Sequence, residues 1–221
     1  MSFLKHLSIF SSILITLCQA TNFTVQNNCP YTVWAAVLPG GAAQLNQGQN
    51  WEFDLDPTST SQGRIWARTN CKFDGSGHGT CESGDCNGVL RCQSYGKAPV
   101  NFAQYQLNIA DRDYIGISLV DGYNVPMEFK SQSRFCAEEV QCMGDINGIC
   151  PTELRDPGGC HSPCTVFSNN QFCCFTGSCG PTVYSSMFKE MCPDAYTYPK
   201  DDATKLVSCP AGSNYAVVFC P

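Results

Sequence analysis

The stretch DYIGISLVDG, Asp113 to Gly122, joins a strand-like run to a carboxylate that could do chemistry. Its aromatic and β-branched residues predict a buried strand, and Asp121 follows where the strand gives way to a turn. Side chains at such edges often form sites. Gly116 interrupts the run, although glycine within a strand costs roughly 0.5–1 kcal/mol relative to alanine. The stretch therefore predicts that Asp121 borders a site, and the role of Gly116 needs an explanation.

Other catalytic arrangements are not evident in the sequence. It has no Gly-x-Ser-x-Gly elbow, and no histidine has an evident serine or aspartate partner in a nucleophile–base arrangement. His78, in the loop GSGHGTC, is better explained as a loop residue than as a base. The glycines of that loop are not followed by the strand-to-helix pattern that holds a phosphate.

The first twenty residues have the pattern of a secretory signal peptide. Lys5 precedes an apolar run from Leu7 to Leu17, and we expect cleavage after Ala20. The run is too short to favour a membrane span. One of the 17 cysteines, Cys18, lies in this segment, which leaves an even number. Export through an oxidising compartment predicts that the remaining cysteines form disulfides.

Composition argues against several other classes of site. CESGDC and CCFTGSC lack the paired Cys-x-x-Cys spacing of zinc sites, and beyond the signal only His78 and His161 remain. We therefore expect no metal and no cofactor. The formal charge of −6 argues against nucleic acid or anionic lipid as a partner. We also expect a monomer without a stable membrane anchor.

The cysteine-poor parts of the chain are predicted to form strands. They are rich in β-branched and aromatic residues and are separated by turn-forming stretches such as LPGG and DGYNVP. Repeated short strands of this kind favour an antiparallel sandwich or barrel. The predicted strands are residues 23–26, 31–38, 50–56, 64–69, 113–120 and 215–219.

The cysteine-dense part, from Cys136 to Cys192, predicts loops and a few short helices. Residues 181–192 carry apolar side chains at helical spacing, with Pro181 expected in the first turn. Ser162 and Pro163 predict a second helix start, as a cap followed by a first-turn proline. Disulfides worth about 2–4 kcal/mol each would replace the apolar core that this part lacks.

The stretch GHGTCESGDCNGVLRC, Gly77 to Cys92, resembles the signature of thaumatin-like proteins, a plant defence family. Ser83 stands where that signature usually has threonine. NNCPYTVWAA, RIWART, ISLVDGYNVPM and PGGCHSPCTVF extend the resemblance across residues 21–221. It implies a mainly β fold, with an antiparallel β-sandwich domain, a disulfide-rich domain carrying short helices and a small disulfide loop domain. The implied domains are residues 21–68, 100–143 and 193–221 for the sandwich, 144–192 for the disulfide-rich domain and 69–99 for the loop domain.

The disulfide pairing follows from the resemblance. Adjacent cysteines rarely bond each other, so Cys173 and Cys174 are expected to have different partners, and the family pairing agrees. By cysteine order it joins Cys29 with Cys220, Cys71 with Cys81, Cys86 with Cys92, Cys136 with Cys209, Cys142 with Cys192, Cys150 with Cys160, Cys164 with Cys173 and Cys174 with Cys179.

Antifungal members of the family typically line a cleft between the sandwich and the disulfide-rich domain with one arginine and four acids. By resemblance, Arg64 matches the arginine, Asp121 the third acid and Asp194 the fourth. Gln104 and Gly116 stand where the family usually has glutamate and aspartate. A glutamine can hydrogen-bond a sugar hydroxyl, but it is neither a catalytic acid nor a nucleophile. The resemblance therefore implies a cleft with weakened acidity.

We expect a plant defence protein that binds fungal cell-wall glucan or membrane targets through this cleft and is less antifungal than members with all four acids. Glycoside hydrolysis needs two carboxylates, about 5–5.5 Å apart for retention or 6.5–9.5 Å for inversion. Asp121 and Asp194 are the candidate catalytic pair of a weak β-1,3-glucanase. Arg64 could equally hold both in a structural ion pair. Because Gln104 and Gly116 stand where two of the acids would be, the expectation leans toward a non-enzyme. An inhibitor or receptor ligand acting through another surface is a third hypothesis.

The C-terminal end, one sequon and several aromatic residues allow predictions about localisation and the surface. The sequence stops at Pro221, without the tail that vacuolar members usually carry, so we expect the extracellular space, the apoplast. Asn22 forms the one Asn-x-Ser/Thr sequon, but glycosylation so close to the mature N-terminus is not favoured. Five aromatic residues could stack on sugars, although most are expected in the core. They are Trp34, Trp51, Trp66, Tyr95 and Tyr123.

Overall fold

The computed structural model describes residues 20–56, 58, 61–177, 179–201 and 206–221. The predicted signal peptide therefore lies outside the described residues, apart from Ala20. No helix in the described ranges combines the length and the apolar character needed to cross a membrane.

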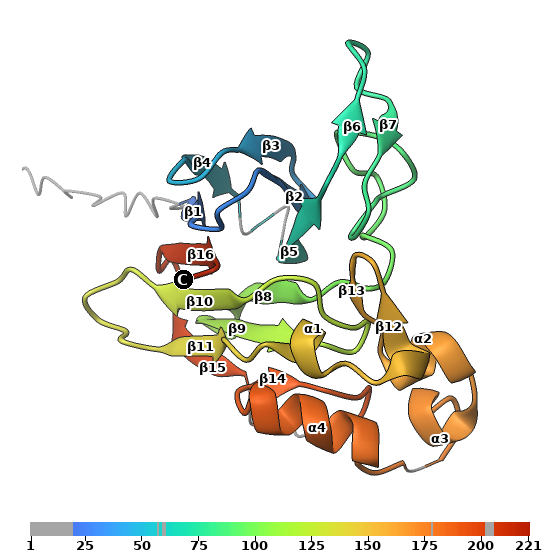
Figure 1. The fold of residues 1–221 in the computed structure, drawn as a ribbon. Coiled ribbons are helices and arrows are strands. Elements are labelled where there is room, and N and C mark those ends of the chain that lie inside the picture. Colours follow the sequence, from blue (N-terminus) through green and yellow to red (C-terminus); the bar gives the residue numbers. More distant parts are fainter. Residues whose placement is uncertain (1–19, 57, 59–60, 178, 202–205) are drawn as a thin grey trace, which may run out of the picture.

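Two large β-sheets build most of the fold (Figure 1). The first has the strand order β11 (Glu139–Cys142), β10 (Met127–Ser131), β16 (Tyr215–Phe219), β1 (Thr21–Asn27) and β4 (Asn50–Leu55). The second has the order β14 (Ala195–Tyr196), β9 (Arg112–Ser118), β8 (Phe102–Ile109), β5 (Gln62–Thr69), β2 (Val33–Leu38) and β3 (Ala42–Leu45), and β15 (Val207–Pro210) also pairs with β9. The predicted mainly β class is confirmed.

Most neighbouring strands are antiparallel, but each large sheet also contains a parallel pair. β1 runs parallel to β16, with Val25 opposite Val217. β14 runs parallel to β9, with Ala195 opposite Ile117. Parallel neighbours need a long connection, and both pairs join segments that are far apart in the sequence. The sheets are therefore mixed, and most of their strand pairs are antiparallel, as the predicted sandwich requires.

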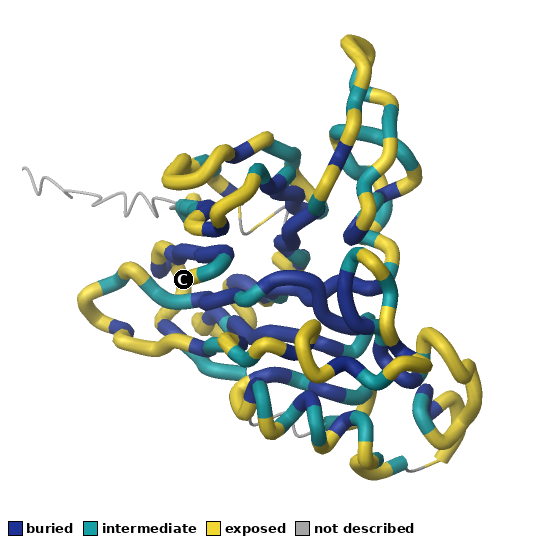
Figure 2. The backbone as a smooth tube through the Cα atoms, viewed as in Figure 1, coloured by how far each residue is buried: buried dark blue, intermediate teal, exposed yellow. Residues whose placement is uncertain are grey.

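A shared core joins the two sheets. Along β1 the residues alternate between buried and half-buried, as expected for a strand with one face in the core. Phe23 of β1 contacts Tyr105 of β8 in the opposite sheet, with ring centroids 5.1 Å apart, and Tyr215 of its own sheet at 5.5 Å. Figure 2 shows that buried segments concentrate in the central strands, whereas the tip of the β6–β7 hairpin is exposed.

Small elements surround the sandwich. Two short hairpins, β6 (Lys72–Phe73) with β7 (Gly79–Thr80) and β12 (Arg155–Asp156) with β13 (Gly159–Cys160), extend from it. The helical segments are α1 (Ile146–Ile149), the 3₁₀ helix η1 (Thr152–Leu154), α2 (Pro163–Phe167), α3 (Asn170–Cys173) and α4 (Val183–Met191). Eight disulfides join these parts, in the pairs that the resemblance implies.

The two predicted helix starts have different outcomes. Ser162 caps α2 by accepting from Thr165 N, and Pro163 occupies the first turn, as predicted. The expectation for Pro181 is wrong, because α4 begins after Thr182. The Thr182 and Ser185 side chains each accept from the other residue's backbone N–H, which satisfies two donors and fixes the start. Pro181 therefore lies just before the cap.

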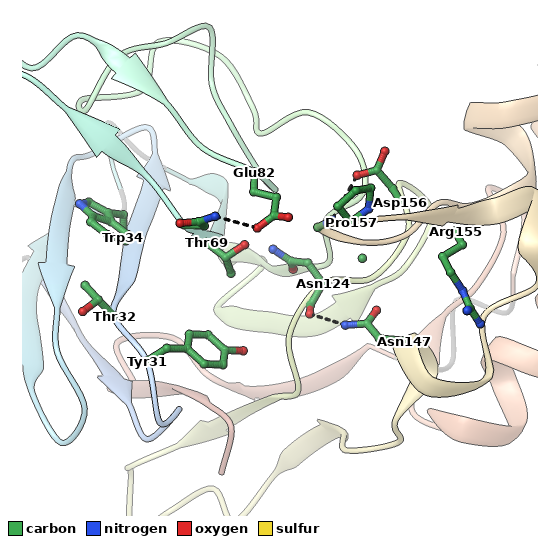
Figure 3. Close-up of a pocket in the computed structure, with 13 residues that line it drawn as sticks. Tyr31, Thr32, Trp34, Thr69, Glu82, Asn124, Asn147, Arg155, Asp156 and Pro157 are labelled. Carbon is green, nitrogen blue, oxygen red and sulfur yellow. Dashed lines mark hydrogen bonds between the residues drawn. The ribbon is translucent and has the colours of Figure 1, made fainter.

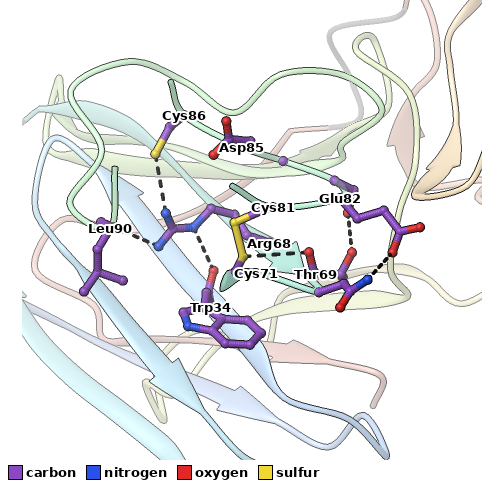
Figure 4. Close-up of a disulfide and its surroundings, with 12 residues drawn as sticks. Trp34, Arg68, Thr69, Cys71, Cys81, Glu82, Asp85, Cys86 and Leu90 are labelled. Atoms are coloured by element: carbon purple, nitrogen blue, oxygen red, sulfur yellow. Dashed lines mark hydrogen bonds between the residues drawn. A yellow bond between two sulfur atoms is a disulfide. The ribbon is translucent and has the colours of Figure 1, made fainter. Parts of the chain in front are cut away.

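Arg68 fastens the loop region 69–99 to the second sheet (Figure 4). Its side chain is fully buried on β5, and it donates to the Trp34, Val89 and Leu90 carbonyls at 2.9 to 3.1 Å. Burial lowers the pKa of Arg68 to about 10, so the guanidinium keeps its charge at neutral pH. The buried charge is acceptable because backbone carbonyls satisfy it.

Candidate functional site

Three residues of the predicted cleft form one row across the second sheet. Arg64 of β5 pairs with Gln104 of β8, and Gln104 pairs with Gly116 of β9. Paired residues in adjacent strands lie on the same face of a sheet. Gly116 is buried, and its backbone completes the row without contributing a side chain.

Two aromatic rings position the Arg64 side chain. Its guanidinium carbon lies 4.7 Å from the centroid of Tyr95 and 4.8 Å from that of Phe102. Contacts of this kind between a cation and a ring contribute about 0.5–2 kcal/mol each. Phe102 comes from β8, whereas Tyr95 comes from the loop region, so the arginine lies where the two parts meet. No local sequence pattern indicates that Phe102 would hold this arginine.

The Arg64 side chain forms an ion pair with Asp121. Asp121 Oδ2 lies 3.4 Å from Arg64 Nη1, which is longer than the 2.7–2.9 Å or so of a close charged hydrogen bond. The two side chains are 32% and 39% exposed, and an ion pair this accessible contributes about 0–1 kcal/mol. Burial raises the pKa of the Asp121 carboxyl above its ordinary value, and the charge of Arg64 opposes this shift.

Asp194 lies farther along the same sheet. It is exposed and directly precedes β14, whose first residue, Ala195, pairs with Ile117. The strand order β14-β9-β8-β5 places β14 three strands from Arg64, or about 14 Å at the usual strand spacing. In the part of the chain that the structure describes, the ion pair of Arg64 is with Asp121 alone. Of the two aspartates that Arg64 could hold, the structure shows an ion pair with Asp121.

A pocket of about 260 Å³ opens beside this row. Gln62, Arg64, Gln104 and Gln106 provide polar groups, and Tyr95 provides an aromatic wall. Amides and a guanidinium can donate to several oxygens, and a ring can cover an apolar face of a ligand. Because Asp121 is the only hydrogen-bond partner of the Arg64 side chain among the described residues, most of the guanidinium N–H donors remain for a ligand. The lining suits a polyhydroxyl or weakly anionic ligand.

The other candidate sites among the described residues would be a metal-binding cluster and the two histidines. No three His, Cys, Asp or Glu side chains there lie close enough together to hold a metal ion. His78 contacts Ser76 Oγ of its own loop through Nδ1 at 3.0 Å. His161 Nε2 lies 3.5 Å from Asp156 Oδ2.

Comparison with known proteins shows the family of this chain. The Thaumatin family model matches residues 27–221, nearly the whole of the described chain. The chain belongs to the thaumatin family. Two relatives of this thaumatin-family chain are a thaumatin-like protein from Actinidia deliciosa, 52% identical with both chains covered in full, and zeamatin from Zea mays, 50% identical with 96% of each chain covered.

A solved structure supports the fold of the thaumatin-family chain. The thaumatin-like xylanase inhibitor TLXI superposes with a TM-score of 0.52 at 25% identity, covering 90% of this chain and 99% of the inhibitor.

Proposed function

We propose that this thaumatin-family chain is an exported plant defence protein that binds fungal cell-wall β-glucan, or a membrane component, through the Arg64 pocket. Its eight disulfides and its family support export and defence. The observation that carries the binding role is the row Arg64, Gln104 and Gly116, in which the arginine keeps free donors and its neighbours carry no charge.

The same row argues for binding rather than efficient hydrolysis. Gln104 and Gly116 occupy positions where a carboxylate could act as acid or nucleophile, and neither can do so. Asp121 is engaged by Arg64, and among the described residues the ion pair of Arg64 does not include Asp194. Glucan hydrolysis by Asp121 and Asp194 is therefore the alternative, and we expect it to be weak.

Binding to insoluble β-1,3-glucan tests the proposal. Arg64→Ala should weaken binding about tenfold or more, since a charged hydrogen bond contributes about 1.5–3 kcal/mol. Arg134→Ala is the matched control. Arg134 also lies over an aromatic ring, Phe135 at 4.7 Å, but outside the pocket, so its loss should leave binding unchanged. Equal binding by both variants and the parent protein would overturn the proposal.

Hydrolysis of the same glucan is measured on the same preparations. The expected result is little or no release of reducing sugar by the purified protein. Robust turnover that Asp121→Asn abolishes would establish the hydrolase instead.

The likeness to a xylanase inhibitor favours a second candidate function, inhibition of a microbial glycoside hydrolase through another surface. Inhibition assays with purified xylanases separate the two functions. Inhibition that survives Arg64→Ala would assign it to a surface other than the pocket, while loss of glucan binding in the same variant would keep the first proposal intact.

A further inference from the structure

A second and larger groove lies away from the Arg64 pocket and shares no lining residue with it. Its volume is about 840 Å³, within the range of about 300–1,000 Å³ usual for ligand sites. Tyr31 and Trp34 come from the β2 end of the sandwich, Glu82 from the loop region, and Asn147 from α1 (Figure 3). Figure 3 shows the Tyr31 ring and the Asn147 side chain directed toward the same hollow, with Glu82 on another wall.

The groove is preformed because Asn124, on its floor, hydrogen-bonds three of the parts that surround it. Asn124 Nδ2 donates to Ala67 O and to Ser83 Oγ, both at 2.9 Å, which joins β5 to the loop region. The backbone carbonyl of Asn124 accepts from Asn147 Nδ2 at 2.9 Å, which adds α1. Asn124 itself is only 4% exposed, so these bonds are shielded from water. A ligand entering the groove would therefore find its walls already placed.

Glycines bring the β12–β13 hairpin against the same walls. A Cβ on Gly158 would lie 2.8 Å from the Glu82 carbonyl oxygen, and one on Gly159 would overlap the carbonyl oxygen of Tyr123. Gly159 also has φ +157°, a conformation that other residues rarely adopt. The hairpin therefore forms a closely packed wall.

The chemistry of the lining indicates the ligand class. Tyr31 is 44% exposed, so one large aromatic surface is free for stacking. Glu82 and Asn70 are joined by a 3.1 Å hydrogen bond, which leaves further carboxylate and amide positions for hydroxyl groups. Among the described residues, the lining contains one cation, Arg155, which donates to Cys150 O at 2.8 Å. It also contains two carboxylates, Glu82 and Asp156, so negative charge exceeds positive charge. This charge balance disfavours an anion, and a ring with carboxylates and amides suits the apolar face and hydroxyls of a sugar.

We propose that this groove binds a short neutral oligosaccharide, with a sugar ring stacked on Tyr31 and hydroxyl groups bonded to Glu82 and Asn147. It is a saccharide site distinct from the Arg64 pocket. Two such sites on one rigid molecule can engage one polymer at separate points, which strengthens attachment beyond either site alone.

The test is a ¹⁵N NMR titration of the disulfide-intact protein with laminarihexaose, cellohexaose and xylohexaose. Saturable shifts of the Asn70 and Asn147 side-chain amides report on the groove, and those of Gln62, Gln104 and Gln106 report on the Arg64 pocket. We expect at least one of these neutral hexaoses to shift the groove signals. An anionic control, hexagalacturonate, should not shift them.

Variants at one exposed position establish the contact. Tyr31→Ala should weaken groove binding about tenfold, the effect of losing a ring stack. Tyr31→Phe keeps the ring and should bind within about twofold of the parent protein. Phe175→Ala, at a 66% exposed aromatic outside both sites, is the matched control and should have no effect. Unchanged melting temperatures would show that the variants fold.

Three results would overturn the inference. The first is the absence of saturable groove shifts with all three neutral hexaoses. The second is equal binding by Tyr31→Ala and the parent protein, and the third is equal or tighter binding of hexagalacturonate. Shifts confined to the glutamine amides would overturn the groove while leaving the Arg64 pocket supported. Shifts of the Asn70 and Asn147 amides without shifts of the glutamine amides would support the groove and count against saccharide binding in the Arg64 pocket.

Discussion

At the residue scale, the Arg64 pocket depends on a charge that aromatic rings hold and that an aspartate only partly neutralises. Tyr95 and Phe102 restrict the guanidinium, and Asp121 reaches it at 3.4 Å. An arginine restricted by rings loses less side-chain freedom when a ligand binds. The arrangement resembles a prepared donor site more than a closed structural ion pair.

Gln104→Glu should stabilise the fold, because Gln104 lies directly opposite Arg64 in the sheet register. Opposite charges in that position contribute about 0.2–1 kcal/mol. The new carboxylate would have a lowered pKa, so its contribution is present above the pKa of the unfolded chain and is lost as the pH falls through the folded one. Urea unfolding at pH 7 and pH 3 measures both effects.

Gln106→Glu is the matched control for this change. Gln106 lies two residues along the same strand and pairs with uncharged Gln62, so we expect no comparable gain. Equal gains from the two variants would mean that added negative charge, and not pairing with Arg64, explains the result.

The stability of the protein should depend on the ionisation of Asp121. Its folded pKa is raised by burial, so the folded chain binds this proton more tightly than the unfolded chain, whose value is near 3.8. Stability from this group therefore falls as the pH rises from below 3.8 through the folded pKa. Asp121→Asn lacks this loss, and the melting-temperature difference should move in favour of the variant as the pH rises from 3 to 6. A difference that is constant, or that moves the other way, would contradict the assignment.

At the element scale, β5 serves both sides of its sheet. Ile65 and Ala67 enter the core between the sheets, while Arg64, Trp66 and Arg68 lie on the other face under the loop region. The same strand therefore carries the pocket arginine and the arginine that fastens residues 69–99. A small displacement of β5 should therefore move both the Arg64 pocket and the attachment of residues 69–99.

Arg68→Met should loosen the loop region while keeping its apolar side-chain bulk. The Trp34, Val89 and Leu90 carbonyls would each lose a charged donor, and a buried unsatisfied group costs about 1–3 kcal/mol. We expect a loss of at least 3 kcal/mol in unfolding free energy and faster amide exchange over residues 86–92. Arg64→Met, on the same face but 32% exposed, should cost much less. Similar losses from both variants would refute the fastening role of Arg68.

The elements differ in how well sequence predicts them. The six strands predicted from apolar and β-branched runs are present, as β1, β2, β4, β5, β9 and β16. Short strands such as β11 and β15 carry little periodicity, and they are extended because their neighbours pair with them. Gly116 was recognised as unusual, but its place beside Gln104 depends on a register that only pairing fixes.

Long-range side-chain contacts are the least predictable part. Asp113 begins the strand of the opening stretch and was not expected inside the core, yet it is fully buried. It accepts from Tyr215 Oη at 3.0 Å and from Asn108 N at 2.8 Å. Burial raises the pKa of this carboxyl, and the two donors oppose the shift. Local sequence indicates nothing of a partner more than one hundred residues away.

At the scale of the whole molecule, disulfides divide into long and short closures. Cys29–Cys220 spans 191 residues and closes the β1–β16 pair, whereas Cys174–Cys179 spans five. In the chain-entropy account a longer loop restricts the unfolded chain more. The two kinds of closure should therefore contribute unequally to stability.

Replacing Cys29 and Cys220 by alanine should cost about 5 kcal/mol, and replacing Cys174 and Cys179 about 2 kcal/mol. Guanidinium unfolding of both double variants under non-reducing conditions measures the difference. A larger loss from the short closure would mean that native contacts around α3, and not restriction of the unfolded chain, dominate.

The position of β16 also has a consequence for synthesis. This strand lies between β1 and β10 in the first sheet, although it comes from residues 215–219. A chain made from its N-terminus at about 5–20 residues per second leaves that place empty for on the order of ten seconds or more. During that time the open edges of β1 and β10 can pair with a foreign strand. Correct folding of this sandwich therefore depends on protection of the nascent chain until its last strand emerges.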